Sequence, residues 1–534
     1  MPSLSRHEDF GKSPADVIGE SQYPDYPLMQ KLKTLNIPQY VSETLQALSQ
    51  AGFEAYLVGG CARDLVLSEL TGKTYEPKDW DITTSAKPEQ IVSLFTKTVY
   101  ENTFGTVAVV FENHSEEGDT EPKNYIVEVT TFRKETQYSD NRHPDSISFS
   151  ETLAEDLKRR DFTINALALD AKGNITDLWN GIDDLKKGIV RTVGNADERF
   201  GEDALRLLRA IRFATVFDFA IANETLTSIL NNADRIKNIS FERIRDEFSK
   251  IIMSKYPMTG IGMLSKLKLL QHIIPELEEG IHCEQKGEHI YDVFDHILHA
   301  LGHAADKNEP LDIRLSALFH DIGKPRTRRW DGTKAGGKGK YTFYGHEVVG
   351  ARMVKKIMER LKFPGDISQK VEKLVRYHMF FSDTETITLS AVRRVIVNVG
   401  KENIWDLMEV RECDRVGMKK KEAPYRLRKY HAMIDECLRD PISVSQLKVD
   451  GNVLMNELGI KPGPKMGFIL NALLEEVLDD PEKNTRTYLD TRIMELNVLP
   501  EDELKALGQK AKEKKEELEE KEVSELHAKH GVKK

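Results

Sequence analysis

The sequence predicts an α+β region with a mixed sheet, followed by a long all-α region. Up to about residue 178, short runs with the two-residue alternation of strands alternate with helical patterns. Beyond that residue the apolar side chains recur at helical spacing. A diglycine, Gly59–Gly60, directly follows the strand run Glu54–Val58 and indicates a tight connection to the next element.

That connection has the features of a phosphate-binding turn. Glu54–Val58 is typical of a buried strand, and Gly59–Gly60 lets the backbone turn tightly and approach a ligand. A helix is predicted to follow at Ala62–Leu70. A phosphate bound at this turn would therefore meet the N-terminus of a helix.

Acidic side chains on two predicted strands indicate a magnesium site. In Asp79–Asp81 the strand period of two puts both carboxylates on one face and turns Trp80 to the other. Magnesium prefers one or two carboxylates together with substrate phosphates, so this pair leaves room for a nucleoside triphosphate. Glu128, on the strand pattern Tyr125–Phe132, is a candidate third carboxylate for a second metal or the attacking hydroxyl; alternatively it is an exposed strand glutamate.

A later helix, Ala204–Ala214, presents charged side chains at steps of three residues, which drift by roughly 60° each time. Asp203 and Arg206 are thus neighbours, and an aspartate acceptor beside an arginine donor matches the edges of cytosine and adenine but not of uracil or guanine. Arg209 would face phosphates, and Arg212 lies about half a turn from Asp203. The alternative is an arginine face that pairs with acids of a neighbouring helix.

A second set of candidate metal ligands lies in the helical region. Histidine and aspartate side chains offer nitrogen and oxygen ligands to a transition metal. One metal would take His296, His320, Asp321 and Asp414, and a second would take His346 and His378. A single histidine in a helix is usually packed or solvated, and we expect this of His299 and His303.

Together the motifs resemble those of the class II tRNA nucleotidyltransferases, the CCA-adding enzymes, and their relatives the bacterial poly(A) polymerases. The resemblance runs from about Tyr56 to Leu489. It is carried by the diglycine, the acidic pair and three later motifs: Glu155–Ala166, Glu198–Phe213 and Phe241–Phe248. The second set is similar to an HD-type metal phosphohydrolase domain, with Leu318–Pro325 as its core.

The resemblance implies an activity and roles for individual residues. The activity is addition or repair of the 3'-terminal CCA of tRNA from CTP and ATP, without a nucleic-acid template, by attack of the 3'-hydroxyl on the α-phosphate with release of pyrophosphate. The implied catalytic residues are Asp79, Asp81 and Glu128, with Mg2+ on the two aspartates. The implied nucleotide-binding residues are Gly59, Gly60, Arg63, Arg160, Asp203, Arg206, Arg209 and Arg212.

Other roles follow from the same resemblance. Arg160 would contact the triphosphate, while Asp161 and Asn165 would organise sugar recognition or only the local fold. The HD site would be a phosphatase or 2',3'-cyclic phosphodiesterase that uses Ni2+, Co2+ or Mn2+. The alternatives are a poly(A) polymerase, an enzyme that adds only CC or only A, an HD hydrolase with an inactive RNA-binding head, and a pure RNA-binding module.

Composition limits the mode of RNA contact and the setting. The 534 residues carry a net charge of -10, so RNA would be bound through local basic patches, for which we expect Lys158–Arg160, Arg206–Arg212 and Lys419–Lys429. The four cysteines form no Cys-x-x-Cys pair, and no apolar run reaches membrane-spanning length. We therefore expect a cytoplasmic protein without a membrane partner, either a monomer or a homodimer.

The motif positions predict six segments. A hairpin excursion is expected at Glu112–Lys123, within the head. The segments are a polar leader (1–36), the nucleotidyltransferase head (37–182), a base-reading neck (183–255), the HD domain (256–430), a tRNA-binding helical tail (431–500) and a charged helical or disordered C-terminus (501–534).

Overall fold

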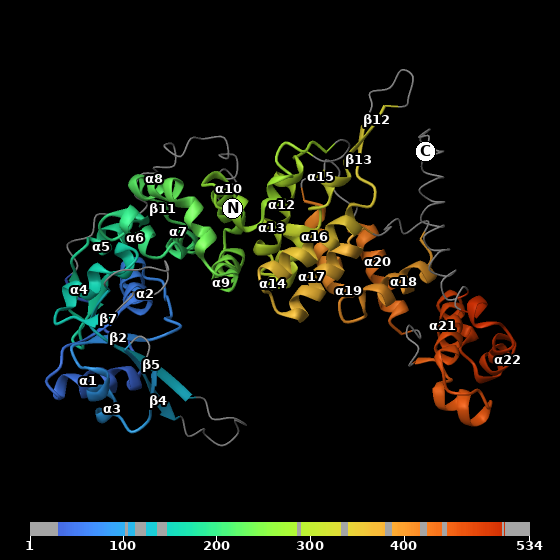
Figure 1. Cartoon of the computed structure of the whole chain (residues 1–534), viewed down its shortest axis with the longest axis horizontal. Helices are drawn as coiled ribbons and strands as arrows, with labels where there is room; N and C mark the ends of the chain where they lie inside the picture. Colours follow the sequence, from blue (N-terminus) through green and yellow to red (C-terminus); the bar gives the residue numbers. More distant parts are fainter. Residues whose placement is uncertain are drawn as a thin grey trace. The chain divides into compact units, whose positions relative to one another are not determined.

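The computed structural model describes residues 30–101, 105–112, 124–135, 147–285, 290–332, 340–379, 387–416, 424–439, 446–504 and 507. The chain divides into two compact units, Met1–Ile273 and Ile274–Lys534 (Figure 1). The finer division into six segments stays a prediction. Among the described residues, none of the helices combines the length and the apolar character needed to cross a bilayer.

Unit 1 (Met1–Ile273) is built on a mixed sheet of seven strands in the order β3-β4-β5-β2-β1-β8-β9. The pair β2 and β5 is parallel and the other pairs are antiparallel. The strands are β1 (Ala55–Val58), β2 (Asp81–Thr84), β3 (Thr98–Glu101), β4 (Thr106–Glu112), β5 (Asn124–Thr131), β8 (Leu167–Leu169) and β9 (Ile175–Asp177). A separate antiparallel pair comprises β6 (Arg133–Glu135) and β7 (Ile147–Phe149).

One face of this sheet is closed by apolar packing. Helix α1 (Gln39–Gln50) contacts β1 and β5, and Tyr40 of that helix stacks on Tyr125 with ring centroids 4.9 Å apart. Val127 and Val129, which share the side of Tyr125 because side chains alternate along a strand, are fully buried. Trp80 is also buried. The opposite face is left for the polar side chains that alternate with these residues.

The remaining helices of unit 1 surround the sheet and continue beyond it. In α9, Ile244, Phe248 and Ile251 are buried at the four- and three-residue spacing of one helix face. The helices are α2 (Gly59–Thr71), α3 (Pro88–Leu94), α4 (Leu153–Lys158), η3 (Thr163–Asn165), α5 (Gly181–Lys187), α6 (Ala196–Glu202), α7 (Leu205–Phe217), α8 (Asn223–Asn232), η4 (Ala233–Asn238), α9 (Phe241–Ile252), α10 (Pro257–Lys266) and α11 (Leu270–Ile273).

Unit 2 (Ile274–Lys534) is mainly helical. One buried cluster includes Leu407, Ile434, Leu473 and Ile493, so a continuous core crosses the predicted boundary at residues 430 and 431. The helices are α12 (Pro275–Glu278), α13 (Val293–Asp306), α14 (Leu311–Phe319), α15 (Lys324–Thr327), α16 (His346–Arg360), α17 (Gly365–Tyr377), α18 (Leu389–Val399), α19 (Ile404–Asp414), α20 (Pro424–Cys437), η6 (Val453–Glu457), α21 (Pro464–Asp479), η7 (Pro481–Lys483) and α22 (Arg486–Asn497).

The predicted fold class is confirmed, and the structure corrects three of its details. Helix α2 begins at Gly59 rather than at Ala62, and β2 begins at Asp81, with Asp79 just before it. The region predicted to be all-α contains short strands: β10 (Ile189–Val190) with β11 (Ala220–Ile221), and β12 (Arg329–Asp331) with β13 (Lys340–Thr342). Strands of two or three residues are too short for their alternation to stand out in a sequence.

Some predicted features fall at the edge of the described residues. The hairpin excursion begins and ends as expected, because Glu112 of β4 pairs with Asn124 of β5. Residues 113–123 themselves lie outside the described residues, as do 1–29, 417–423 and 508–534. The basic run Lys419–Lys421, most of the leader and most of the charged C-terminus therefore stay predictions.

Candidate functional site

Strand register brings the predicted acids of unit 1 together. Asp81 of β2 is the direct partner of Glu128 in β5. Directly opposed residues in a sheet point to the same side, so both carboxylates leave the face opposite to the buried valines. Asp79 lies close enough to raise the pKa of Asp81 by charge repulsion. Asp79 lies before β2, so strand alternation does not govern its direction, and the expectation that Asp79 and Asp81 share one face stays a prediction.

The first turn of α2 lies next to Asp81. Gly59 has φ +71°, a conformation that glycine adopts at little cost. A Cβ atom at Gly59 would lie 3.2 Å from Nη1 of Arg160 and 3.3 Å from Oδ2 of Asp81. Glycine is therefore required here both by the backbone angle and by the close approach of a cation and an acid.

Burial and Arg160 set the charge of the acidic pair. Burial raises the pKa of Asp81, Arg160 lowers it, and Asp79 raises it further. Asp79 is exposed, so the pair opens to solvent on one side. Arg160 is anchored by Asp156, a fully buried carboxylate that also holds Arg159 at 2.7 Å. The guanidinium of Arg160 and the carboxylate of Asp81 thus lie next to Gly59 of the diglycine turn, with Asp79 close to Asp81.

A buried polar relay links α2 to α7. Arg63 is almost buried, and its Nη1 donates to Oδ1 of Asn165 at 2.8 Å. Nδ2 of Asn165 donates to Oδ1 of Asp161 at 3.1 Å, and Nε of Arg209 donates to the other oxygen of Asp161 at 2.7 Å. The guanidinium groups of Arg63 and Arg209 also lie over the ring of Phe213. The relay holds Arg209, expected to face phosphates, against Asp161.

The ion pair explains the electrostatics of Asp161. Burial alone would raise the pKa of this carboxyl, but Arg209 and the hydrogen bond from Asn165 hold it well below its usual range. Asp161 is therefore a permanent carboxylate that positions α7. Of the two roles considered for Asp161 and Asn165, organisation of the local fold is the one with visible contacts.

The two expected base-reading side chains are held by different partners. Asp203 follows the last residue of α6, and both its oxygens accept from Arg243 of α9, at 2.7 and 3.3 Å. Arg206 of α7 donates to Glu202 and to the backbone oxygens of Arg159 and Arg199. These contacts hold both side chains in place, and the backbone N–H of Arg206 donates to the backbone oxygen of Asp203 at 3.0 Å.

Arg212 matches the alternative reading of an arginine paired with a neighbouring helix. Its Nη1 donates to Glu247 of α9 at 3.0 Å, and its guanidinium lies 4.3 Å from the centroid of the Phe213 ring. Burial lowers the pKa of Arg212 to about 10, and Arg209 adds to this effect. Arg212 therefore contributes to packing between α7 and α9.

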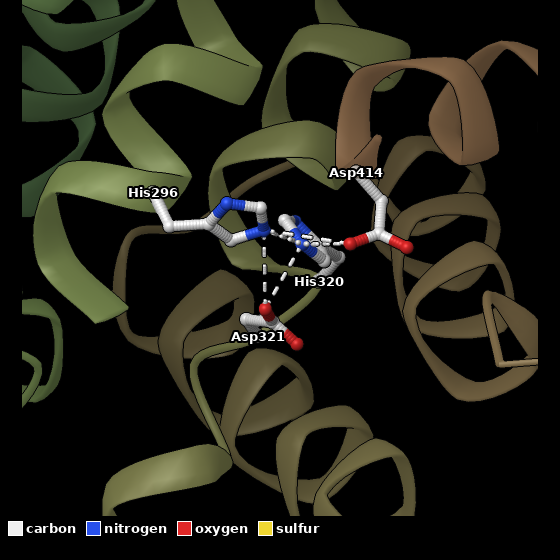
Figure 2. Close-up of side chains that lie close together, drawn as sticks. All are labelled: His296, His320, Asp321 and Asp414. Atoms are coloured by element: carbon white, nitrogen blue, oxygen red, sulfur yellow. Dashed lines mark hydrogen bonds and ion pairs between the residues drawn. The ribbon is translucent and has the colours of Figure 1, made fainter. Parts of the chain in front are cut away.

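In unit 2 the first predicted metal-ligand set converges in a buried centre (Figure 2). His296 comes from α13, His320 and Asp321 follow α14, and Asp414 ends α19. The Nε2 atoms of the two histidines are 3.2 Å apart. Each of these atoms lies 3.2 to 3.4 Å from one oxygen of Asp321 and from one oxygen of Asp414. All four side chains are buried, so the centre could hold a metal ion.

Asp321 joins this set to the second one. Its Oδ2 faces His296 and His320, whereas its Oδ1 faces His346 at 3.3 Å and His378 at 3.7 Å. Within the described residues, these two sets are the groups in which three or more such ligand atoms lie within 4.8 Å of one another. The acids that the structure describes in unit 1 do not form such a closed set.

The backbone orients three of the imidazoles. Nδ1 of His320, His346 and His378 lies 2.7 to 2.8 Å from the backbone oxygens of Ala317, Phe343 and Val375. A carbonyl oxygen can only accept, so Nδ1 carries the proton and Nε2 is turned to the centre. Burial lowers the pKa of His320, but Asp321 and Asp414 raise it to about 10. A metal ion bound to Nε2 of His320 would take the place of the second proton of the ring, while Nδ1 keeps its own proton.

Several residues of these sites were not assigned from the sequence. Arg243 lies 40 positions from Asp203 and Glu247 lies 35 from Arg212, so no spacing rule pairs them. Lys324 belongs to the expected HD core, and its Nζ lies 2.5 Å from Oδ2 of Asp321 and from Gln285. Its spacing of three residues from Asp321 is the signal that could have identified it.

Comparison with known proteins assigns families to the regions that contain the two sites. Three family models match in order: the Poly A polymerase head domain over residues 55–191, the probable RNA and SrmB-binding site of polymerase A over residues 218–281, and the HD domain over residues 288–430. A structure of the Bacillus stearothermophilus CCA-adding enzyme in complex with CTP is similar, with a TM-score of 0.63 and 26% identity, covering 86% of this chain and 97% of that one.

Sequence relatives extend over most of the chain. The CCA-adding enzyme of Limosilactobacillus reuteri (strain DSM 20016) is 32% identical over 455 residues, which are 85% of this chain and 95% of that protein. The CCA-adding enzyme of Lactobacillus johnsonii is 45% identical over 224 residues, 41% of this chain and 52% of that protein. This protein therefore belongs to the CCA-adding enzymes, a family of nucleotidyltransferases.

Proposed function

We propose that this protein adds or repairs the 3'-terminal CCA of tRNA, using CTP and ATP. The observation that carries the proposal is the register that sets Asp81 beside Glu128, with Asp79 and the diglycine turn at the same place. The similar Bacillus structure in complex with CTP supports cytidine triphosphate as one substrate. The match to an RNA-binding family model over residues 218–281 supports an RNA as the acceptor.

The residues divide the work of phosphoryl transfer, which needs positioning and charge neutralisation more than covalent chemistry. Mg2+ held by Asp79 and Asp81 would supply charge neutralisation at the triphosphate. Gly59 lets the phosphates approach the backbone, and Arg160 orients them next to Asp81. Glu128, the register partner of Asp81, orients the attacking 3'-hydroxyl.

Base choice follows from the fixed pair Asp203 and Arg206. Cytosine and adenine each present an amine donor beside a ring nitrogen acceptor, which a carboxylate and a guanidinium match. Arg243 and Glu202 hold the two side chains in place without a nucleic-acid template. Uracil and guanine would set donor against donor at Arg206 and acceptor against acceptor at Asp203.

Incorporation of labelled CTP and ATP into tRNA tests the proposal. Acceptors that end at the discriminator base, at C and at CC should receive CCA, CA and A. Use of ATP alone on any RNA would indicate a poly(A) polymerase. Addition of only CC, or of only A to the CC end, would indicate an enzyme that makes part of the triplet, and no addition at all would refute nucleotidyl transfer.

We propose a second activity in unit 2, the metal-dependent hydrolysis of phosphate esters at RNA ends, including 2',3'-cyclic phosphates. Two ligand sets that share the carboxylate of Asp321 support it. The mixture of imidazole and carboxylate ligands suits Ni2+, Co2+ or Mn2+. Lys324, which contacts Asp321, adds a positive charge beside the place where a phosphate would bind.

Hydrolysis of 2',3'-cyclic AMP by protein loaded with each of the three metals tests this activity. We expect hydrolysis with at least one metal and its loss in His320→Ala. Equal activity of His320→Ala and the parent would assign the hydrolysis to a contaminant. Absence of hydrolysis with all three metals would leave unit 2 as a scaffold. Retention of CCA addition by His320→Ala shows that unit 1 of the variant is folded, and an unchanged circular dichroism spectrum is the control for unit 2.

A further inference from the structure

A two-stranded hairpin grows out of the segments that carry the metal ligands of unit 2. Strand β12 follows the helix that begins at Lys324, and β13 ends at Thr342, just before His346. Figure 1 shows the two strands standing out from the helices around them. The HD family model covers the segment, but none of the residues expected from the sequence to act in the site lies on the hairpin.

The root of the hairpin is fixed to the centre. The backbone oxygen of Phe343 accepts from Nδ1 of His346, and Nζ of Lys324 lies 5.8 Å from the centroid of the Phe343 ring while it contacts Asp321. Tyr341 is five residues before His346, a distance of at most roughly 17 Å along an extended chain. A molecule bound on the hairpin can therefore reach the centre.

One face of the hairpin combines aromatic rings with a cation. Trp330 and Tyr341 are direct register partners, so they point to the same side, and their rings meet edge to face at 4.8 Å. Arg328 is two residues before Trp330, and its guanidinium lies 3.7 Å from the centroid of the Tyr341 ring. Trp330 is 55% exposed, and Tyr344 beside the root is 53% exposed. Such exposure of large aromatic rings is typical of a binding surface.

We propose that Arg328, Trp330 and Tyr341 form a subsite for a single-stranded RNA end, whose last bases stack on Trp330 while the terminal phosphate enters the His/Asp centre. The proposal rests on the proposed hydrolase function and names its substrate. Aromatic rings that alternate with arginines bind single-stranded nucleic acid without regard to base identity. Local cations are needed for this because the whole chain carries a net charge of -10.

Charge favours RNA over a protein partner for this face. A peptide ligand would be selected mainly by apolar pockets, whereas on this face the stacked Arg328 accompanies the exposed Trp330. A phosphodiester supplies the anion that Arg328 matches, and a base supplies the flat ring that Trp330 matches. A small phosphate ester without a base would not use the hairpin.

The test compares two substrates on metal-loaded full-length protein. One is a short oligoribonucleotide that ends in a 2',3'-cyclic phosphate, and the other is bis(p-nitrophenyl) phosphate. For Trp330→Ala we expect KM for the oligoribonucleotide to rise roughly tenfold, as removal of one base–aromatic stack does, with unchanged kinetics on the small ester. Trp330→Phe should recover most of the loss. Trp405→Ala, which removes another exposed tryptophan of unit 2, is the matched control.

Other outcomes decide against the proposal. An equal loss of activity of Trp330→Ala on both substrates would make Trp330 a structural residue. Unchanged kinetics on both substrates would show that the hairpin does not bind substrate. Quenching of tryptophan fluorescence by the oligoribonucleotide, lost in Trp330→Phe, measures binding without hydrolysis. Quenching with no turnover of any substrate would refute the hydrolase and keep the subsite, whereas turnover without quenching would refute the subsite and keep the hydrolase.

Discussion

The acidic site of unit 1 and the His/Asp centre of unit 2 differ in how far the chain completes them. In unit 2 the ligand atoms of each set lie within 4.8 Å of one another, and all the ligand side chains are buried. In unit 1, Asp79 is exposed, Glu128 is exposed, and the acids form no closed set among the described residues. A closed set can hold a metal by itself, whereas an open pair needs substrate phosphates to finish the shell.

The charges around the two sites show the same difference. In unit 1 the cations Arg159, Arg160, Arg206 and Arg209 are each anchored by a carboxylate, which keeps them in place for an incoming anion. In unit 2 the carboxylates of Asp321 and Asp414 raise the pKa of His320, and a bound metal ion would replace the proton that they stabilise. Unit 1 is thus arranged to receive a charged substrate, and unit 2 is arranged to receive a cation.

The sharpest test of the comparison is Asp81→Ala. Loss of the carboxylate that faces Arg160 and pairs in register with Glu128 should lower nucleotide incorporation by roughly 10³-fold or more, equivalent to about 4 kcal/mol of transition-state stabilisation. Binding of tRNA and hydrolysis at the HD centre should be retained. Primer-extension kinetics with labelled CTP measure the effect. Simultaneous loss of both activities would show that the units are not independent.

Asp321→Ala tests the His/Asp centre of unit 2. Removal of the shared carboxylate should lower the metal content of unit 2 and the hydrolysis of cyclic phosphates by roughly 100-fold, because both ligand sets lose a member. CCA addition should stay unchanged. Elemental analysis of the purified variant after metal loading gives the first readout. Asp295→Ala, which removes a neighbouring acid outside both ligand sets, is the control. Full metal content in Asp321→Ala would contradict the proposed ligation.

Gly59→Ala probes the close approach at the diglycine turn. An added methyl group would meet Arg160 and Asp81 in a backbone conformation that disfavours alanine, and kcat/KM for CTP should fall roughly 10- to 30-fold. Gly52→Ala is the matched control, because it has φ +88° and no heavy atom within 4 Å. It should cost stability without a specific loss of activity. Equal loss of activity in both variants would reduce the effect to backbone strain.

Arg206→Ala should change base choice more than overall rate. Loss of the donor beside Asp203 should lower the preference for CTP over UTP by roughly tenfold, which corresponds to about 1.4 kcal/mol. Competition between labelled CTP and UTP at one acceptor measures the ratio. Arg212→Ala, which breaks the pair with Glu247, should lower the melting temperature and leave the ratio intact. An equal fall in the use of every nucleotide by Arg206→Ala would contradict base reading by this side chain.

Elements with strong local patterns were predictable. The alternation in Tyr125–Phe132 identified β5 as a strand with one apolar face, and the adjacent His320 and Asp321 identified the core of the HD centre. The alternation predicted at Asp79–Asp81 overlaps β2 only at Asp81, the first residue of that strand. The hairpin β12–β13 and the pair β10–β11 were missed because their strands are two or three residues long. Local signals of that length do not separate a strand from a loop.

The sequence by itself determined which chemical groups are present and on which side of each helix or strand they project, because the periods of 3.6 and 2 are properties of the backbone. Only the tertiary structure decided which of those groups meet. The parallel register that sets Asp81 beside Glu128, the bond from Arg243 to Asp203, and the sharing of Asp321 join segments tens of residues apart. Such contacts depend on how whole elements pack, which no local spacing specifies.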